Sequence, residues 1–223
     1  MGVAGPAVAA DATLIVDRRE DSVALYFRTA ASDFETIFGA GADALLAIDG
    51  TVDVPRLYDG TYLLADEIFA TSTVQIGSDV VRFEALSMMV HDPEILPDFA
   101  TPYDAELSIA VCTSPDTVAN MGLSSLEGYL GYFAWKVDGF ADMQISLPQT
   151  GRGALELRVR AYVDHVEVSD QTVILPDGGT LMLTAPRPVM RGFAVWLVVV
   201  ALCFAAVAAG IFWGGTQRPR TAT

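Results

Sequence analysis

The residues best suited to chemistry are a methionine and a histidine in the segment Ser87-Met88-Met89-Val90-His91. On an extended strand, Met89 and His91 are two residues apart, so their side chains face the same way. A thioether together with an imidazole is a ligand pair that suits copper. Cys112 and His165 could add further ligands if the fold brings them close. The sequence therefore carries one metal hypothesis, copper binding by Met89, His91, Cys112 and His165.

The same residues also have an explanation without a metal. Met88 and Met89 suit the filling of an irregular apolar core, and His91 would then end a strand. His165 follows an inward-facing apolar row, which favours a partly buried neutral histidine bonded to backbone groups. No CxxC, HxxxM or histidine-rich tract supports a metal. We therefore expect no resident cofactor, with copper as the alternative.

Signatures of catalysis are missing from the sequence. The segment Gly122-Leu123-Ser124-Ser125-Leu126 lacks the second glycine of a nucleophile elbow. No phosphate-binding loop or dinucleotide fingerprint occurs. The chain has only two histidines and two cysteines, and one of the cysteines, Cys203, lies in an apolar stretch near the C-terminus. General bases and nucleophiles are therefore few, and we assign no catalytic residue and expect no enzyme.

The apolar stretch near the C-terminus predicts a membrane span. From Gly192 to Gly215 there are 24 residues without a charge, and about 20 suffice to cross a bilayer. Trp196 and Trp213 lie 17 residues apart, which is roughly 25 Å along a helix and close to the spacing of the two membrane interfaces. We predict a transmembrane helix at residues 192–214, in contact with the lipid bilayer.

One face of this predicted helix carries small side chains. Ala206, Gly210 and Gly214 recur every four residues. Small residues with this spacing allow a second helix to approach closely, although they also arise by chance in alanine-rich spans. The pattern favours integral membrane protein subunits as partners.

Charge and composition indicate the compartment. All 28 acidic residues and ten of the 13 basic ones precede Arg191, so the first 190 residues have a net charge of −18. This excess of acid excludes a nucleic-acid partner. It fits an acidic surface of a saline habitat, or a surface that steers a cationic periplasmic protein toward the membrane. A single lysine, Lys136, and a single asparagine, Asn120, indicate a GC-rich bacterial genome.

The orientation is expected to place the main domain in the periplasm. Basic residues flank the span equally, so their count decides nothing. Ala7-Val8-Ala9 fits a small-x-small cleavage pattern, which suggests that residues 1–9 are a signal-peptide remnant or a flexible N-terminus. Residues 10–184 then form the soluble domain, residues 185–191 a proline-rich linker, and residues 215–223 a cytoplasmic tail of a single-pass inner-membrane protein.

The soluble domain is predicted to be mainly β. Alternation of apolar and polar residues with a period of two predicts strands with one buried face, and hence an antiparallel β-sandwich. Two late strands at 172–175 and 180–184 flank Pro176-Asp177-Gly178-Gly179, a composition typical of a hairpin turn. The other alternating segments are 22–28, 73–76, 80–85, 106–111, 142–147 and 155–164.

Few segments predict helices. Ser32-Asp33-Phe34-Glu35 fits a capping box with Gly39 as a stop. Residues 62–70 place Leu64 and Ile68 four apart. Residues 126–133 fit either a helix or a strand, because Gly128 and Gly131 weaken a helix there.

Together these features favour a non-catalytic accessory or assembly subunit of a bacterial inner-membrane complex. The small-residue helix face and the short linker motivate this hypothesis. The alternatives are a periplasmic copper-handling protein and, more weakly, a membrane-anchored enzyme.

Overall fold

The computed structural model describes residues 8–83, 85–96 and 98–185. Within these ranges no helix is both long enough and apolar enough to cross a membrane. The predicted span at 192–214 lies outside the described residues, together with the tail at 215–223 and most of the linker. The same holds for the site residues assigned to the span, which are Trp196, Ala206, Gly210, Trp213 and Gly214.

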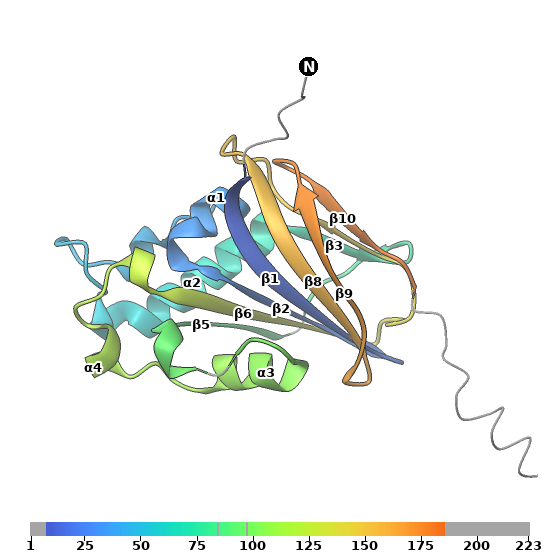
Figure 1. The fold of residues 1–223 in the computed structure, drawn as a ribbon, viewed down its shortest axis with the longest axis horizontal. Coiled ribbons are helices and arrows are strands. Elements are labelled where there is room, and N and C mark those ends of the chain that lie inside the picture. The colour runs from blue at the N-terminus through green and yellow to red at the C-terminus, as the bar shows by residue number, and fades with distance from the viewer. Residues whose placement is uncertain (1–7, 84, 97, 186–223) are drawn as a thin grey trace, which may run out of the picture. The chain divides into compact units, whose positions relative to one another are not determined.

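Two β-sheets form the described domain (Figure 1). The larger sheet has six strands in the order β5-β6-β2-β1-β8-β9, and the smaller has four in the order β10-β7-β3-β4. The strands of the larger sheet are β1 (Val8–Arg19), β2 (Ser22–Ala30), β5 (Ala85–His91), β6 (Glu127–Trp135), β8 (Ala154–Val163) and β9 (Val166–Leu175). Those of the smaller sheet are β3 (Thr73–Ile76), β4 (Asp79–Val80), β7 (Met143–Ser146) and β10 (Thr180–Leu183).

The predicted two-sheet, β-rich architecture is confirmed, but its strands are not all antiparallel. β1 and β8 run parallel, with Leu14 opposite Val159. A parallel pair needs a long crossover between its strands, and here most of the domain lies between them. Hydrophobic alternation reports only which face of a strand is buried, so it could not reveal the direction of the neighbouring strand.

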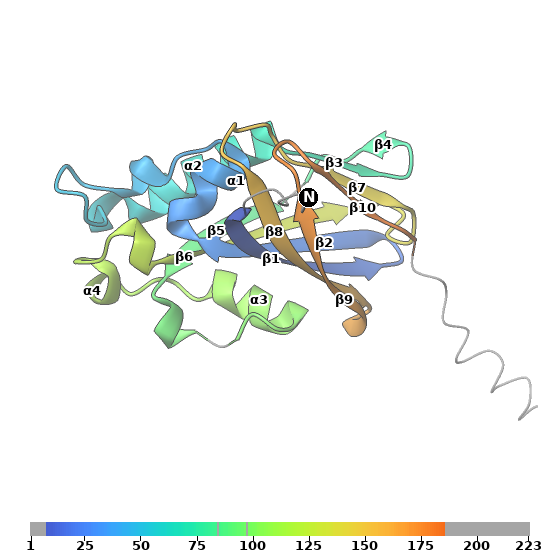
Figure 2. The same ribbon diagram turned by 45° about the horizontal axis from the view of Figure 1, so that its top comes forward.

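Helices cover both faces of the larger sheet (Figure 2), so the domain is a mixed α/β fold. The helices are α1 (Phe34–Phe38), α2 (Leu57–Thr71), α3 (Pro102–Ala110) and α4 (Pro115–Val118). On one face, α1, α2 and the smaller sheet enclose the main core, which includes Leu14, Leu25, Leu64, Ile145 and Leu181. On the other face, α3 covers a second core, which includes Ile15, Tyr26 and Ile109.

The strand predicted at 106–111 is wrong, because residues 106–110 belong to α3 and Val111 is its C-cap. A capping box fixes the start of the helix: the Thr101 hydroxyl accepts from the Asp104 amide at 3.2 Å, and the Asp104 carboxylate accepts from the Thr101 amide at 2.9 Å. Ala105 and Ile109, four residues apart, are buried, whereas Leu107 is exposed. The helical period therefore decides which side chains face the core.

Two further strand predictions need correction. The strand expected at 80–85 is interrupted, because β4 ends at Val80 and β5 begins at Ala85. The late hairpin does not form, because β9 pairs with β8 and β10 pairs with β7. The turn at 176–179 instead carries the chain from the larger sheet to the smaller one. A composition typical of a turn does not specify which strands flank it as partners.

Other local predictions agree with the structure, with small changes. Of the segment 126–133, residues 127–133 lie in a strand, β6, and residues 62–70 lie in α2. The helix after Ser32 forms as α1 and ends at Gly39 in the left-handed region, but its N-cap is Asp33 and makes no side-chain capping bond. β1 begins at Val8, two residues before the expected start of the domain.

Candidate functional site

His91, the centre of the metal hypothesis, is a fully buried structural residue. It ends β5, and its Nε2 lies 2.8 Å from the carbonyl oxygen of Ser108 in α3. A carbonyl oxygen only accepts, so Nε2 donates this bond. Nδ1 lies 3.3 Å from the Thr113 hydroxyl, which donates to the Val90 carbonyl. His91 thus joins β5 to α3, and burial lowers the pKa of its imidazole.

The structure does not gather the proposed copper ligands. Met88 points into the main core. Because side chains alternate along a strand, Met89 lies on the opposite face of β5, which is the face of His91, as expected. Cys112 is exposed and lies beside Tyr58, and His165 lies in the turn between β8 and β9. In the part of the chain that the structure describes, no three His, Cys, Asp or Glu side chains are placed to hold a metal ion.

The buried His91 leads to a pH prediction. Because its folded-state pKa is lowered, the unfolded chain binds the additional proton more readily below the ordinary histidine pKa of about 6.5. We expect the contribution of neutral His91 to the free energy of unfolding to be complete above about pH 6.5. Below that pH it should fall, by up to about 1.4 kcal/mol per pH unit. His91→Gln keeps a donor for the Ser108 carbonyl and cannot titrate, so its urea unfolding should lack this component. An unchanged pH profile in His91→Gln would contradict the assignment.

The sequence favoured a partly buried His165, but the residue is exposed in the structure. Its side chain is 57% exposed, and with Asp164 it forms a two-residue turn in which both φ angles are positive, at 48° and 66°. Asp17 of β1 holds this turn: its carboxylate accepts from the His165 amide at 3.1 Å and lies 3.2 Å from the imidazole Nδ1. The inward-facing row of β8 ends where the turn begins, so it does not extend to His165.

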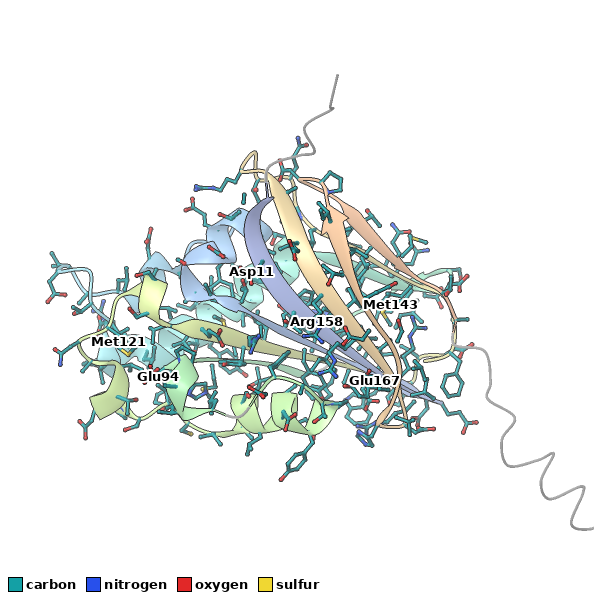
Figure 3. The ribbon with its side chains drawn as sticks, viewed as in Figure 1. Asp11, Glu94, Met121, Met143, Arg158 and Glu167 are labelled. Atoms are coloured by element: carbon teal, nitrogen blue, oxygen red, sulfur yellow. The ribbon has the colours of Figure 1, made fainter. Side chains whose placement is uncertain are left out.

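The outer face of β8 and β9 carries charged pairs (Figure 3). Arg158 donates two hydrogen bonds to Asp170, at 3.0 and 2.7 Å. Arg160 donates to Glu167 at 2.6 Å. These arginines are thus engaged by carboxylates within the domain, and the excess of acid in the sequence remains as net negative charge.

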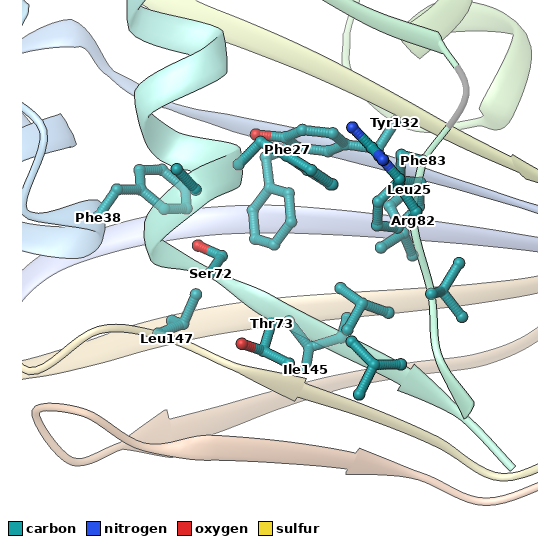
Figure 4. Close-up of a pocket in the computed structure, with 15 residues that line it drawn as sticks. Leu25, Phe27, Phe38, Ser72, Thr73, Arg82, Phe83, Tyr132, Ile145 and Leu147 are labelled. Atoms are coloured by element: carbon teal, nitrogen blue, oxygen red, sulfur yellow. The ribbon is translucent and has the colours of Figure 1, made fainter. Parts of the chain in front are cut away.

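The strongest candidate for a binding site is a cavity of about 370 Å³ between the two sheets (Figure 4). Its walls come from β2 and β6 of the larger sheet, from β3 and β7 of the smaller one, from α1 and the C-terminal end of α2, and from residues 80–83. The volume is at the lower end of the range of about 300–1,000 Å³ that is usual for small-molecule sites. Val80 at its edge is 72% exposed, and Thr73 and Arg82 are also exposed, so the cavity opens to solvent on this side.

Aromatic rings form much of the wall. The ring centroids of Phe69 and Phe83 are 5.7 Å apart, and both rings contact Tyr132, at 6.1 and 5.3 Å. Phe27 and Phe38 form a second pair with centroids 5.7 Å apart and an interplanar angle of 83°. Such edge-to-face pairs hold each other in place, so the wall is both apolar and firmly packed.

Two of the lining residues, Tyr132 and Ser72, carry hydroxyl groups that are enclosed by packed atoms. Tyr132 is only 5% exposed, and within the part of the chain that the structure describes neither its hydroxyl nor that of Ser72 has a hydrogen-bond partner. Burial raises the pKa of Tyr132, so the phenol keeps its proton at neutral pH. Buried hydroxyls without partners are rare, and leaving one unpaired costs roughly 1–3 kcal/mol.

No protein-family model matches the chain, and no curated protein shows significant sequence similarity to it. The cavity was not predicted from the sequence, because its residues come from separate segments that each resemble ordinary core. The only local signal is a polar residue within an apolar alternation, such as Tyr132 between Gly131 and Phe133. That signal is too common in strands to indicate a site on its own.

Proposed function

We propose that the chain is a non-catalytic accessory or assembly subunit of a bacterial inner-membrane complex. One transmembrane helix at residues 192–214 anchors it, and the two-sheet domain lies in the periplasm. The observation that carries the proposal is the stretch of 24 uncharged residues from Gly192 to Gly215, which is long enough to cross a bilayer.

The roles of the polar residues in the domain support a subunit that acts by binding. His91 joins β5 to α3, and Asp17 holds His165 in its turn. Arg18 donates to three backbone carbonyls. These side chains, which could otherwise do acid–base chemistry or bind a charged substrate, are used to hold the fold together. No observation favours copper as a second function, because among the described residues no three His, Cys, Asp or Glu side chains are placed to hold a metal ion.

Two kinds of partner fit this proposal. Integral membrane subunits would pack against the face formed by Ala206, Gly210 and Gly214, where side chains are small. A cationic periplasmic protein would be attracted by the net charge of −18 on the first 190 residues. Added salt weakens the attraction of the cationic protein, whereas it does not weaken helix packing within the bilayer.

Reporter fusions test the anchor and its orientation. We expect an alkaline phosphatase fused after Thr223 to be inactive, because the tail is cytoplasmic, and a fluorescent protein at the same position to be bright. A phosphatase fused after Ala185, before the span, should be active. Active phosphatase at Thr223 would reverse the orientation, and recovery of the full chain in the soluble fraction would remove the anchor.

A further inference from the structure

We propose that one end of the folded domain contacts the lipid bilayer and inserts the side chains of Trp135 and Phe140 into the bilayer interface. These two residues belong to the aromatic segment, residues 135–142, which comprises the last residue of β6 and the loop before β7. The proposal rests on the membrane anchor proposed above, because it concerns the bilayer that the anchor would enter. It adds a second contact with that bilayer, made by the domain itself.

The last described residues of the chain lie beside the aromatic segment. The Ala185 amide donates to the Asp142 carboxylate at 2.6 Å. Arg18 joins the same two parts of the chain, because its guanidinium donates to the carbonyls of Ala141 at 2.6 Å and Leu183 at 3.2 Å. The chain therefore leaves the two-sheet domain next to the aromatic segment.

The linker that follows is too short to hold this end of the domain far from the bilayer. Only residues 186–191 separate Ala185 from Gly192, where the predicted span begins. Even when fully extended, a connection of this length reaches no more than about 25 Å. The end of the domain that carries the aromatic segment is therefore the end that the linker keeps close to the membrane.

Two large apolar side chains of the aromatic segment face solvent. Trp135 is 47% exposed and Phe140 is 36% exposed. The loop that carries them is held in place, because the Val137 amide donates to the Asp21 carbonyl at 3.2 Å and the Phe140 amide donates to the Asp138 carboxylate at 3.0 Å. Aromatic rings exposed on a fixed loop suit the interfacial region of a bilayer, where tryptophan is enriched.

The charges of the segment indicate how it would contact lipid. Lys136, the single lysine of the chain, is exposed beside Trp135, and an ammonium group there can pair with a lipid phosphate. The segment also carries Asp138 and Asp142, and the first 190 residues have a net charge of −18, so attraction to anionic lipid would not hold the domain on the membrane. We therefore expect insertion of the aromatic rings, which depends on burial of apolar surface, to make the contact.

Quenching of tryptophan fluorescence by brominated phosphatidylcholine tests this contact on the full chain in nanodiscs. The chain has three tryptophans, which are Trp135, Trp196 and Trp213. Trp196→Phe combined with Trp213→Phe leaves Trp135 as the only one. Relative to discs of unbrominated lipid, we expect bromolipid to remove about half of its emission, because an interfacial ring lies next to the acyl chains.

Two further single-tryptophan chains are controls. The first combines Ile48→Trp with phenylalanine at all three natural tryptophan positions. Ile48 is fully exposed, and Figures 1 and 2 show its loop, before α2, at the opposite end of the domain from β10. We expect bromolipid to leave this emission unchanged. The second control keeps only Trp213 and reports the anchor, so its emission should be quenched.

The outcomes separate this contact from the anchor. Quenching of Trp213 without quenching of Trp135 would overturn the contact and leave the anchor in place. Equal quenching of Trp135 and of the tryptophan at position 48 would also overturn it, because no end of the domain would then be preferred. If Trp213 is not quenched and the chain does not stay with the discs, the anchor is wrong and the contact is wrong with it.

Discussion

Replacement of Arg18 with alanine is expected to lower the free energy of unfolding of the domain by roughly 3–5 kcal/mol. Arg18 lies in β1 and is 3% exposed. Its Nη1 donates to the carbonyls of Ala141 at 2.6 Å and Gly139 at 3.4 Å, and its Nη2 donates to the carbonyl of Leu183 at 3.2 Å. Loss of the guanidinium leaves these acceptors without their donor and removes a link between β1 and the end of β10.

The surroundings of Arg18 leave little room for compensation. The loop that supplies two of the carbonyls runs so close to β1 that a Cβ on Gly139 would lie 1.9 Å from the Arg19 carbonyl oxygen. Burial lowers the pKa of Arg18 and nearby Asp142 opposes this shift, so removal of the cation also leaves Asp142 without a favourable charge. A water molecule could not replace three hydrogen bonds in such a close approach without moving the loop.

Urea unfolding of the full chain in detergent, followed by circular dichroism, measures the effect. The control is Arg152→Ala, which removes an ion pair with Glu35 in which both side chains are about half exposed. Exposed pairs contribute little, so this variant should lose less than about 1 kcal/mol. If Arg18→Ala lowers the free energy of unfolding no more than Arg152→Ala does, the buried arginine does not hold the two sheets together.

The strand prediction for β8 succeeded because one face of this strand meets solvent. β8 alternates Leu155, Leu157 and Val159 with the outward-facing Glu156 and Arg158, and it was located to within a residue. The segment at 106–111 alternates as well, but a capping box at Thr101 starts a helix before it. Local hydrogen bonds at the helix start thus outweighed the alternation that follows.

Features that depend on distant parts of the chain could not be predicted. The parallel pairing of β1 with β8 joins segments that are far apart in the sequence. The position of His165 depends on Asp17, a residue of another strand. The cavity depends on the packing of several segments. Nothing in the sequence distinguishes Tyr132, whose hydroxyl has no partner among the described residues, from Tyr129, whose hydroxyl donates to Glu127.

Gly210→Leu is expected to abolish copurification of the partner subunits while the membrane level of the chain stays normal. If Ala206, Gly210 and Gly214 face a partner helix, close approach depends on their lack of bulk. Leucine at position 210 inserts an isobutyl group into that contact and separates the helices. Membrane insertion should persist, because leucine is more favourable than glycine within a span.

Affinity purification in a gentle detergent, with mass spectrometry of the proteins recovered, is the most direct test of the accessory-subunit proposal. The wild-type chain and the control Val199→Leu, which adds bulk outside the small-residue row, should recover the same integral membrane subunits in stoichiometric amounts. Gly210→Leu should recover the chain alone. Equal recovery of partners by Gly210→Leu and Val199→Leu, or no stoichiometric partner with the wild-type chain, would contradict the proposal.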